Sequence, residues 1–273
     1  MTDRDYDGIS SARPPAAIDT SVAHIARIYD YWLGGKDNYA VDREAAENAL
    51  AAMPSIAAGV RANRAFLRRA VRYLAGEAGI GRFLDIGTGL PAADNTHEVA
   101  QSVNPASRIV YADNDPIVLA HARALLTSTT QGATGYIDAD LRDTGTVLRA
   151  AARTLDLTQP VGVMLVAVLH MIGDHHKPHA VVAELLDAMP SGSYLVLSHP
   201  AKDILPVAAA EAGRRLGELM AHRPTLRSHA EVTRFFAGLD LLVPGVVQLP
   251  QWRPERPGDA GLVPMWGGAG RKS

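Results

Sequence analysis

The sequence has no cysteine among its 273 residues, and this absence excludes several kinds of chemistry at once. Disulfide bonds, thiol nucleophiles, iron–sulfur clusters and zinc sites with thiolate ligands all require that side chain. A chain of this composition suits a reducing compartment. We therefore expect a cytoplasmic protein.

Long hydrophobic runs and an excess of positive charge are missing as well. The longest apolar run, VGVMLVAVL at residues 161–169, is far shorter than the roughly 20 residues that a membrane span needs. The first residues, MTDRDYDGISS, are acidic where a secretory signal is basic and then apolar. With 27 basic and 29 acidic residues the formal net charge is −2, which disfavours a dedicated nucleic-acid-binding protein. We expect neither a membrane anchor nor a nucleic-acid partner.

The remaining composition is that of a globular protein, with 47% hydrophobic and 21% charged residues. The length suits one large domain, or one domain with an elaborated cap. Residues 1–20 contain Pro14-Pro15 and no apolar period, which predicts a disordered lead-in. Apolar positions at helical spacing predict three helices in residues 21–80, at about 21–33, 41–53 and 55–76. We interpret residues 21–80 as a helical cap or lid and residues 81–273 as the core.

Beyond residue 80 the pattern changes to short apolar runs separated by stretches long enough for helices. The strand candidates are residues 82–86, 108–112, 134–138, 161–169 and 193–198. Nearly continuous apolar strands that alternate with helices predict a parallel sheet covered on both faces, in a doubly wound α/β fold. The C-terminal part predicts helices at 203–220 and 228–238, followed by a hairpin of strands 241–249 and 261–268 that closes one sheet edge.

The strongest chemical signal is FLDIGTGLPAADN at residues 83–95, in which Asp85, Gly87 and Gly89 follow an apolar strand. Glycines let the backbone approach a ligand closely, and a following helix N-terminus offers unpaired N–H groups. A dinucleotide-binding loop would carry a third glycine and no acid ahead of the first, so NAD and FAD are disfavoured. A carboxylate in this place attracts an ammonium group, which predicts a ligand that is cationic at this end.

Two more acids stand at strand ends. Asp113, in YADNDP, is placed to accept hydrogen bonds from both hydroxyls of a ribose, whereas the Asp115-Pro116 pair is typical of a helix N-cap. Asp140, in YIDADLRD, is a candidate for an adenine amino group, with the Leu141 backbone at the ring edge; a solvated acidic loop is the alternative. Together these positions describe an amino acid joined to a ribose and an adenine.

At this point the chain resembles the class I S-adenosylmethionine-dependent methyltransferases. The segment ARIYDYWLGGKDNYAVDREAA at residues 26–46, joined to FLDIGTGLP, resembles more narrowly the S-adenosyl methyltransferase family with a Y-D-Y-x-L-G-G-K-D-N motif ahead of the cofactor loop. The resemblance covers about residues 22–270. It implies a Rossmann-like seven-stranded sheet with the last strand antiparallel, an N-terminal helical cap and S-adenosylmethionine as methyl donor.

Carried over residue by residue, the resemblance implies a set of cofactor contacts. The methionine end would lie against Asp85, Gly87, Thr88 and Gly89, the ribose on Asp113, and the adenine near Asn114, Asp140 and Leu141. The N-terminal motif, with Tyr29, Gly34, Gly35 and Asn38, would fold over the cofactor as a lid; the alternative is that it only packs the cap and ends a helix. Arg64, for the methionine carboxylate, and Ala167 complete the set, although Arg64 also belongs to a row of arginines typical of a solvated helix face.

The methyl acceptor side is predicted from AVLHMIGDHHKPH, residues 167–179, which follows the fourth strand. His170 is the candidate general base, since an unperturbed imidazole is mostly neutral at pH 7. The stretch LHMIGD resembles the one that carries a catalytic histidine in some small-molecule O-methyltransferases; a histidine that only lines the pocket is the alternative. His199 is a second pocket candidate. We expect no metal, because Pro178 interrupts a helix through His175 and His179.

These observations predict a methyltransferase that moves a methyl group to an oxygen or nitrogen of a small molecule. The alternative is a module that binds S-adenosylmethionine or S-adenosylhomocysteine as a sensor, without catalysis. A nucleic-acid methyltransferase is disfavoured, because AVLH stands where its Asn/Asp-Pro-Pro-aromatic tetrapeptide would be. The sequence predicts no particular oligomeric state.

Overall fold

A computed structural model describes residues 19–125, 127–255 and 261–273 of the protein. All but the last two residues of the expected lead-in lie outside the described residues. The three helices expected between residues 21 and 80 are confirmed as α1 (Ile25–Trp32), α2 (Ala40–Ala52) and α3 (Ile56–Gly76). The helix α1 begins a few residues later than expected, because the His24 side chain caps it by accepting a hydrogen bond from the backbone N–H of Ala26.

The centre of the molecule is one mixed sheet with the order β3-β2-β1-β4-β5-β8-β6, in which the short β7 also pairs with β8. Strands β1 to β5 are parallel and β8 is antiparallel to β5. The predicted Rossmann-like sheet with an antiparallel last strand is therefore confirmed, with eight strands among the described residues because the short β7 is added to the expected seven. The strands are β1 (Arg82–Ile86), β2 (Arg108–Asp113), β3 (Ala133–Asp138), β4 (Gly162–Val166), β5 (Tyr194–Pro200), β6 (Leu239–Leu241), β7 (Val247–Gln248) and β8 (Met265–Lys272).

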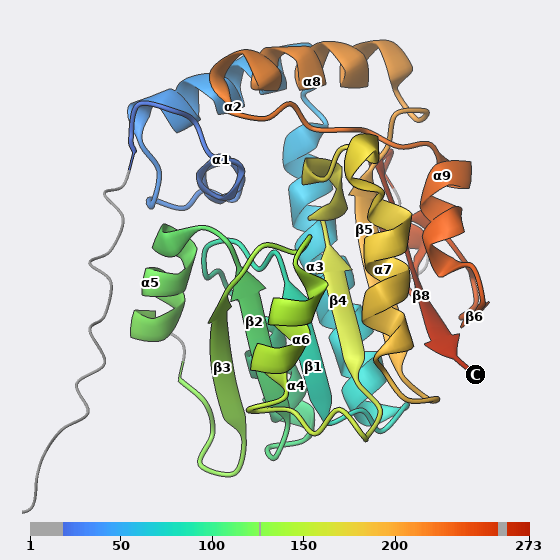
Figure 1. The fold of residues 1–273 in the computed structure, drawn as a ribbon. Helices are drawn as coiled ribbons and strands as arrows, with labels where there is room; N and C mark the ends of the chain where they lie inside the picture. Colours follow the sequence, from blue (N-terminus) through green and yellow to red (C-terminus); the bar gives the residue numbers. More distant parts are fainter. Residues whose placement is uncertain (1–18, 126, 256–260) are drawn as a thin grey trace, which may run out of the picture.

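Helices cover both faces of this sheet (Figure 1), as its nearly continuous apolar strands require. One face packs against α3 and α4, and the other against α6 and α7. Each fully buried Leu, Ile, Val or Phe contributes roughly 1.5–3 kcal/mol to this packing. No helix in the described part of the chain is long and apolar enough to cross a membrane. The remaining helices are α4 (Thr96–Val103), α5 (Pro116–Leu125), α6 (Thr144–Ala151), α7 (Pro178–Asp187), α8 (Pro206–Leu219) and α9 (His229–Thr233).

The C-terminal strands differ from the expected simple hairpin. The predicted strand at 241–249 is split into β6 and β7, and both pair with β8, which runs on to residue 272. Pro244 lacks a backbone N–H, and Gly245, at φ +90°, turns the chain, so the strand is interrupted. The predicted strand ended at residue 268, because the glycines in the β8 sequence MWGGAGRK interrupt the apolar alternation by which strands are recognised.

The helices α1, α2 and α8 lie together above the carboxyl ends of the parallel strands (Figure 1). We call these three helices the lid; they differ from the cap expected at residues 21–80, because α3 packs mostly on the sheet and α8 joins from the C-terminal part. Their contact surfaces are rich in alanine, so that the helices approach closely, and the start of α3 packs into the same cluster. The chain entering α1 pairs with the chain leaving α8 through a bridge between Ala23 and Met220. The lid is therefore assembled from two parts of the sequence.

Candidate functional site

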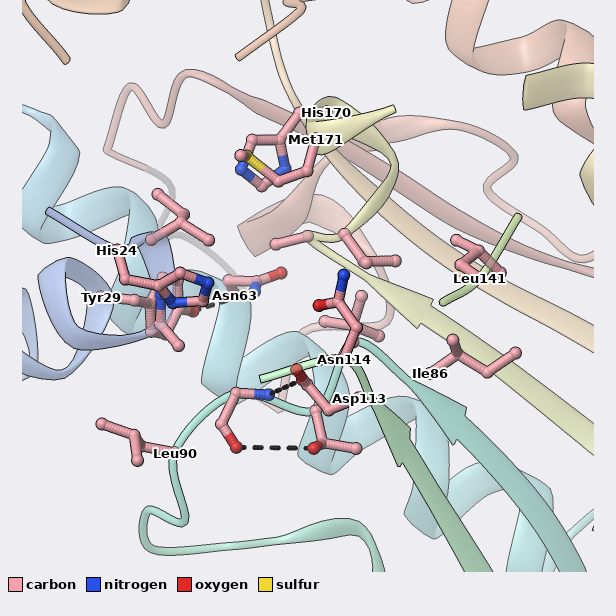
Figure 2. Close-up of a pocket in the computed structure, with 18 of the residues that line it drawn as sticks. His24, Tyr29, Asn63, Ile86, Leu90, Asp113, Asn114, Leu141, His170 and Met171 are labelled. Atoms are coloured by element: carbon pink, nitrogen blue, oxygen red, sulfur yellow. Dashed lines mark hydrogen bonds between the residues drawn. The ribbon is translucent and has the colours of Figure 1, made fainter. Parts of the chain in front are cut away.

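A cavity of about 1100 Å³ lies between the carboxyl ends of β1 to β4 and the lid. Sites for one small ligand usually occupy roughly 300–1000 Å³, so this cavity has room for two ligands. Figure 2 shows Asp113 and Asn114 on one side of it, His170 and Met171 on the opposite side, and His24 and Tyr29 reaching in from α1 and the residue before it. After the ligands expected from the sequence, we call the side at β1, β2 and β3 the cofactor end and the side at residues 168–176 and 221–225 the acceptor end.

The loop after β1 has the backbone shape that its glycines predict. Gly87 and Gly89 have φ values of +73° and +64°, in the left-handed region that favours glycine. A Cβ atom at Gly87 would lie 2.2 Å from Cγ2 of Val168, whereas a Cβ at Gly89 would meet open space. Helix α4 begins only at Thr96, so its N-terminus does not stand directly behind these glycines as the motif suggested.

Asp85 is buried at the end of β1 and accepts a 2.6 Å hydrogen bond from the Thr96 hydroxyl. Burial raises the pKa of the Asp85 carboxyl to about 6, against the opposing effects of Thr96 and the Arg64 charge. The group is mostly ionised at pH 7 yet poorly solvated. A cationic ligand would stabilise it.

Asp113 lies at the carboxyl end of β2 and lines the cavity. Its Oδ2 accepts the Gly89 N–H at 3.1 Å and its Oδ1 accepts the Asp115 N–H at 2.9 Å, while burial raises its pKa. Each carboxylate oxygen has a second acceptor position, so two hydroxyl donors can still be received. Asp115 caps α5 through a 2.8 Å bond from the Ile117 N–H, which confirms its predicted structural role.

The third acid, Asp140, forms an ion pair with Arg142. Asp140 lines the cavity but accepts hydrogen bonds from Nε and Nη2 of Arg142, at 2.9 and 2.6 Å, and this pairing lowers its pKa. Asn114 Nδ2 lies 3.5 Å from Asp140, and Leu141 is a buried part of the same wall. An incoming amino group would have to share this carboxylate with Arg142.

The N-terminal motif contributes Tyr29, Gly34 and Gly35 to the cavity wall. The Tyr29 hydroxyl accepts a 2.9 Å hydrogen bond from Nδ2 of Asn63, whose Oδ1 accepts a 2.6 Å bond from the Ser198 hydroxyl. This buried chain of polar groups, which neither sequence motif indicated, connects α1 through α3 to β5.

Asn38 holds the motif together from outside the cavity wall. Its Nδ2 donates to Oδ2 of Asp30 and to the carbonyl of Gly35, at 2.9 and 3.1 Å. A side chain at Gly35 would collide with the Asp30 carboxylate, and Gly34, at φ +83°, ends α1. Asn38, an expected cofactor contact, thus supports the loop that lines the cavity and is not itself among the lining residues.

Two further expected residues line the cavity with unusual features. Arg64 donates from Nη2 to the carbonyls of Ala93 and Asp94, at 2.7 and 2.9 Å, while its buried Nε has no partner among the described residues. Ala167, directly after β4, has a φ of +54°, a conformation that is costly for a residue with a side chain. Such strain is typical of functional loops.

His170 forms part of the acceptor end, in a single 3₁₀ turn (Leu169–Met171) after β4. It is buried, and its Nδ1 has no hydrogen-bond partner in the described part of the chain. Burial, helped by the nearby Arg227 charge, lowers the pKa of His170 to about 4. The imidazole is therefore not unperturbed, as the sequence alone suggested, and it is neutral across the physiological range.

Arg227 is a buried residue that the sequence did not single out. Its Nη1 donates to the carbonyl of Leu169 and to Nε2 of His199, at 2.8 and 2.9 Å. Its Nη2 donates to the carbonyl of Ile172 and to Oδ1 of Asp174, at 2.8 and 2.7 Å. One guanidinium thus fixes both sides of the turn that carries His170.

His199 supports that turn from behind and does not line the cavity. Because a guanidinium only donates, Nε2 of His199 accepts from Arg227, and its Nδ1 carries the proton that is donated to the Pro200 carbonyl at 2.9 Å. Burial lowers the His199 pKa to about 3. Within the described residues, no group of three potential metal ligands is found near these histidines or elsewhere.

A Rossmann-like sheet with an acid-lined pocket at the carboxyl ends of β1 to β3 is typical of enzymes that bind a cofactor containing a nucleoside. The family model described as S-adenosyl methyltransferase matches residues 11–273, so the chain belongs to this family. It is a methyltransferase whose cofactor is S-adenosylmethionine.

Two solved structures of similar proteins agree with this assignment. A crystal structure of a DUF574 family protein from Streptomyces avermitilis is 43% identical, with a TM-score of 0.90, and the match covers 93% of this chain and 99% of that one. A putative methyltransferase from Thermobifida fusca is 41% identical, with a TM-score of 0.87 and coverage of 96% and 100%. A search of curated proteins gives no match.

Proposed function

We propose that this methyltransferase transfers the methyl group of S-adenosylmethionine to an oxygen or nitrogen of a small molecule held at the acceptor end of the cavity. The observation that carries the proposal is the arrangement of one cavity with two different ends. Acids at strand termini line the first, and the neutral, partly unpartnered imidazole of His170 lines the second. We propose the cytoplasm as its compartment, which a chain without cysteine suits.

The residues of the cofactor end fit S-adenosylmethionine by their chemistry. The buried Asp85 carboxylate suits the ammonium group, and the unpartnered Nε of Arg64 suits the carboxylate. The open acceptor positions of Asp113 suit the ribose hydroxyls. The remaining proposed contacts are Gly87, Thr88 and Gly89 at the methionine end, Asn114, Asp140 and Leu141 at the adenine, Ala167 at the end of β4, and Tyr29, Gly34 and Gly35, supported by Asn38, above the cofactor.

S-adenosylmethionine, when bound, supplies an electrophilic methyl group. The contribution of this chain is to align the acceptor and to receive its proton. Alignment can provide effective molarities of roughly 10⁵–10⁸ M, whereas a general base contributes about 10²- to 10⁴-fold. A base with a pKa of about 4 is a weaker proton acceptor than one tuned to pH 7, so we assign the larger share to alignment and a smaller one to His170.

The proposal is tested by calorimetry of the purified protein with S-adenosylmethionine, S-adenosylhomocysteine and NAD. We expect micromolar binding of the first two and no binding of NAD. A screen of hydroxyl- and amine-bearing small molecules then follows S-adenosylhomocysteine formation. Binding without turnover on any acceptor would contradict the proposed transfer to small molecules, and binding of NAD alone would contradict the assignment of the cofactor end.

A further inference from the structure

Two of the four arginines that line the cavity have no partner among the described residues. Each acid that lines it already accepts hydrogen bonds or pairs with a cation within the protein: Asp30, Asp85, Asp94, Asp113, Asp140 and Asp174. Two lining arginines, Arg64 and Arg142, are also engaged. The other two, Arg61 and Arg223, have no hydrogen bond or ion pair with any residue in the described part of the chain.

Arg223 is held in place by an unusual feature of the lid. A Cβ atom at Gly217, inside α8, would lie 2.8 Å from Cγ and 3.0 Å from Cβ of Arg223, so the arginine stem fills the space that this glycine leaves. Glycine in a helix interior costs roughly 1 kcal/mol relative to alanine. The acids of α8 do not compete for the guanidinium, because Glu211 and Glu218 pair with Arg214 and Arg215.

The segment that carries Arg223 is hydrogen-bonded to the turn that carries His170. The backbone N–H of Thr225 donates to the His170 carbonyl at 2.7 Å, and Arg227 binds the carbonyls on both sides of that turn. Arg223 therefore belongs to the acceptor end, while Asp85 and Asp113 form the cofactor end. Arg223 is exposed and lines the cavity in which the methyl acceptor is proposed to bind.

We infer that the methyl acceptor carries a carboxylate and that Arg223 binds this group while the acceptor's hydroxyl or amine faces His170. The inference rests on the proposed function. A guanidinium is suited to this role because it presents two parallel N–H donors to a planar carboxylate and remains charged. Arg223 is then the residue that determines acceptor specificity.

The test compares carboxylates with their neutral amides as ligands of the full-length protein. The probes are 3-hydroxybenzoate with 3-hydroxybenzamide and 4-aminobenzoate with 4-aminobenzamide. Their binding is measured by calorimetry in the absence and presence of saturating S-adenosylhomocysteine. We expect at least a tenfold preference for a carboxylate over its amide. This preference should disappear in Arg223→Gln and persist in the control Arg214→Gln, which changes an arginine of α8 that does not line the cavity.

A second variant, Gly217→Ala, tests the geometry rather than the charge. The added methyl group displaces the Arg223 stem while favouring the helix, so we expect a folded protein whose carboxylate preference is reduced several-fold. No carboxylate preference in the natural protein, or a preference that survives Arg223→Gln, overturns the inference. A loss of S-adenosylhomocysteine affinity in Arg223→Gln does so too, because it assigns Arg223 to the cofactor. Failure of the proposed function shows separately, as absent cofactor binding or absent turnover.

Discussion

The two ends of the cavity are built from different kinds of sequence information. At the cofactor end, Asp85, Gly87 and Gly89 lie within one strand-to-loop connection, and Asp113 stands at the end of the adjacent strand. At the acceptor end, Arg227 binds the carbonyl of Leu169, 58 positions earlier in the chain. The proposed cofactor contacts are thus encoded by short motifs, whereas the proposed acceptor site depends on contacts that only the folded chain creates.

The ends also differ in how burial affects their charges. Burial raises the pKa of Asp85 to about 6 and raises that of Asp113, while it lowers the pKa of His170 to about 4. In each case burial favours the uncharged form. Ionisation of the buried acids therefore destabilises the cofactor end as pH rises, and protonation of His170 destabilises the acceptor end as pH falls. Substitutions that remove these groups should therefore change stability with pH in opposite directions.

The largest effect on turnover is expected from His170→Ala. If the imidazole receives the acceptor's proton, turnover falls at least tenfold and up to about 10⁴-fold, with unchanged cofactor affinity. In the natural protein, activity should rise with pH through about 4, because the base must be neutral. Steady-state kinetics across pH and calorimetry check both points. Equal activity of the variant would reduce His170 to a residue that only lines the cavity.

The next effect is expected from Arg227→Gln, which leaves the carbonyl of Ile172 and Nε2 of His199 without their donor. The carbonyl of Leu169 keeps the Ile172 N–H as a donor. The free energy of unfolding should fall by roughly 2–6 kcal/mol, since each of these two buried unsatisfied groups costs about 1–3 kcal/mol. Loss of the positive charge should also raise the pKa of His170, as measured by NMR titration. Arg234→Gln, at an exposed arginine nearby, is the control. A variant with unchanged stability and unchanged His170 pKa would disprove the positioning role.

Asp85→Asn should stabilise the cofactor-free protein at alkaline pH. The folded pKa of about 6 lies above the value of 3.8 for the unfolded chain, so the carboxyl stabilises the fold below pH 3.8 and loses that stability as pH rises through 6. The neutral amide avoids this loss, which corresponds to about 3 kcal/mol at pH 8 and to nothing near pH 3. Urea unfolding at several pH values measures the difference. An advantage that does not depend on pH would refute the electrostatic explanation.

A smaller change is expected from Asp113→Ala at the cofactor end. Affinity for S-adenosylmethionine should fall by roughly 1–3 kcal/mol, because charge-assisted hydrogen bonds to the ribose hydroxyls are lost. Asp138→Ala removes an exposed carboxylate from the adjacent strand end, outside the cavity, and should leave affinity unchanged. Calorimetry on both variants decides the assignment, and equal affinities would remove Asp113 from the cofactor site.

The sequence predicted the sheet and the cofactor end for physical reasons that operate locally. Buried parallel strands need continuous apolar runs, and left-handed turns such as Gly87 need glycine, so both leave a pattern in neighbouring residues. Arg227 left no such pattern, because the sequence does not distinguish a buried arginine with four hydrogen-bond acceptors from an exposed one. The depressed pKa of His170 and the free guanidinium of Arg223 likewise depend on neighbours that are distant in sequence.

The pairing of Ala23 with Met220 has a consequence for how the molecule folds. Helices α1 and α2 emerge early in synthesis, but their alanine-rich surface finds its partner in α8 only after strands β1 to β5 have been made. Contacts between such distant segments carry a high loop-closure cost and form late. The lid should therefore be the last part of the protein to gain protection in pulse-labelling hydrogen exchange, so that the carboxyl edge of the sheet stays open until α8 has packed.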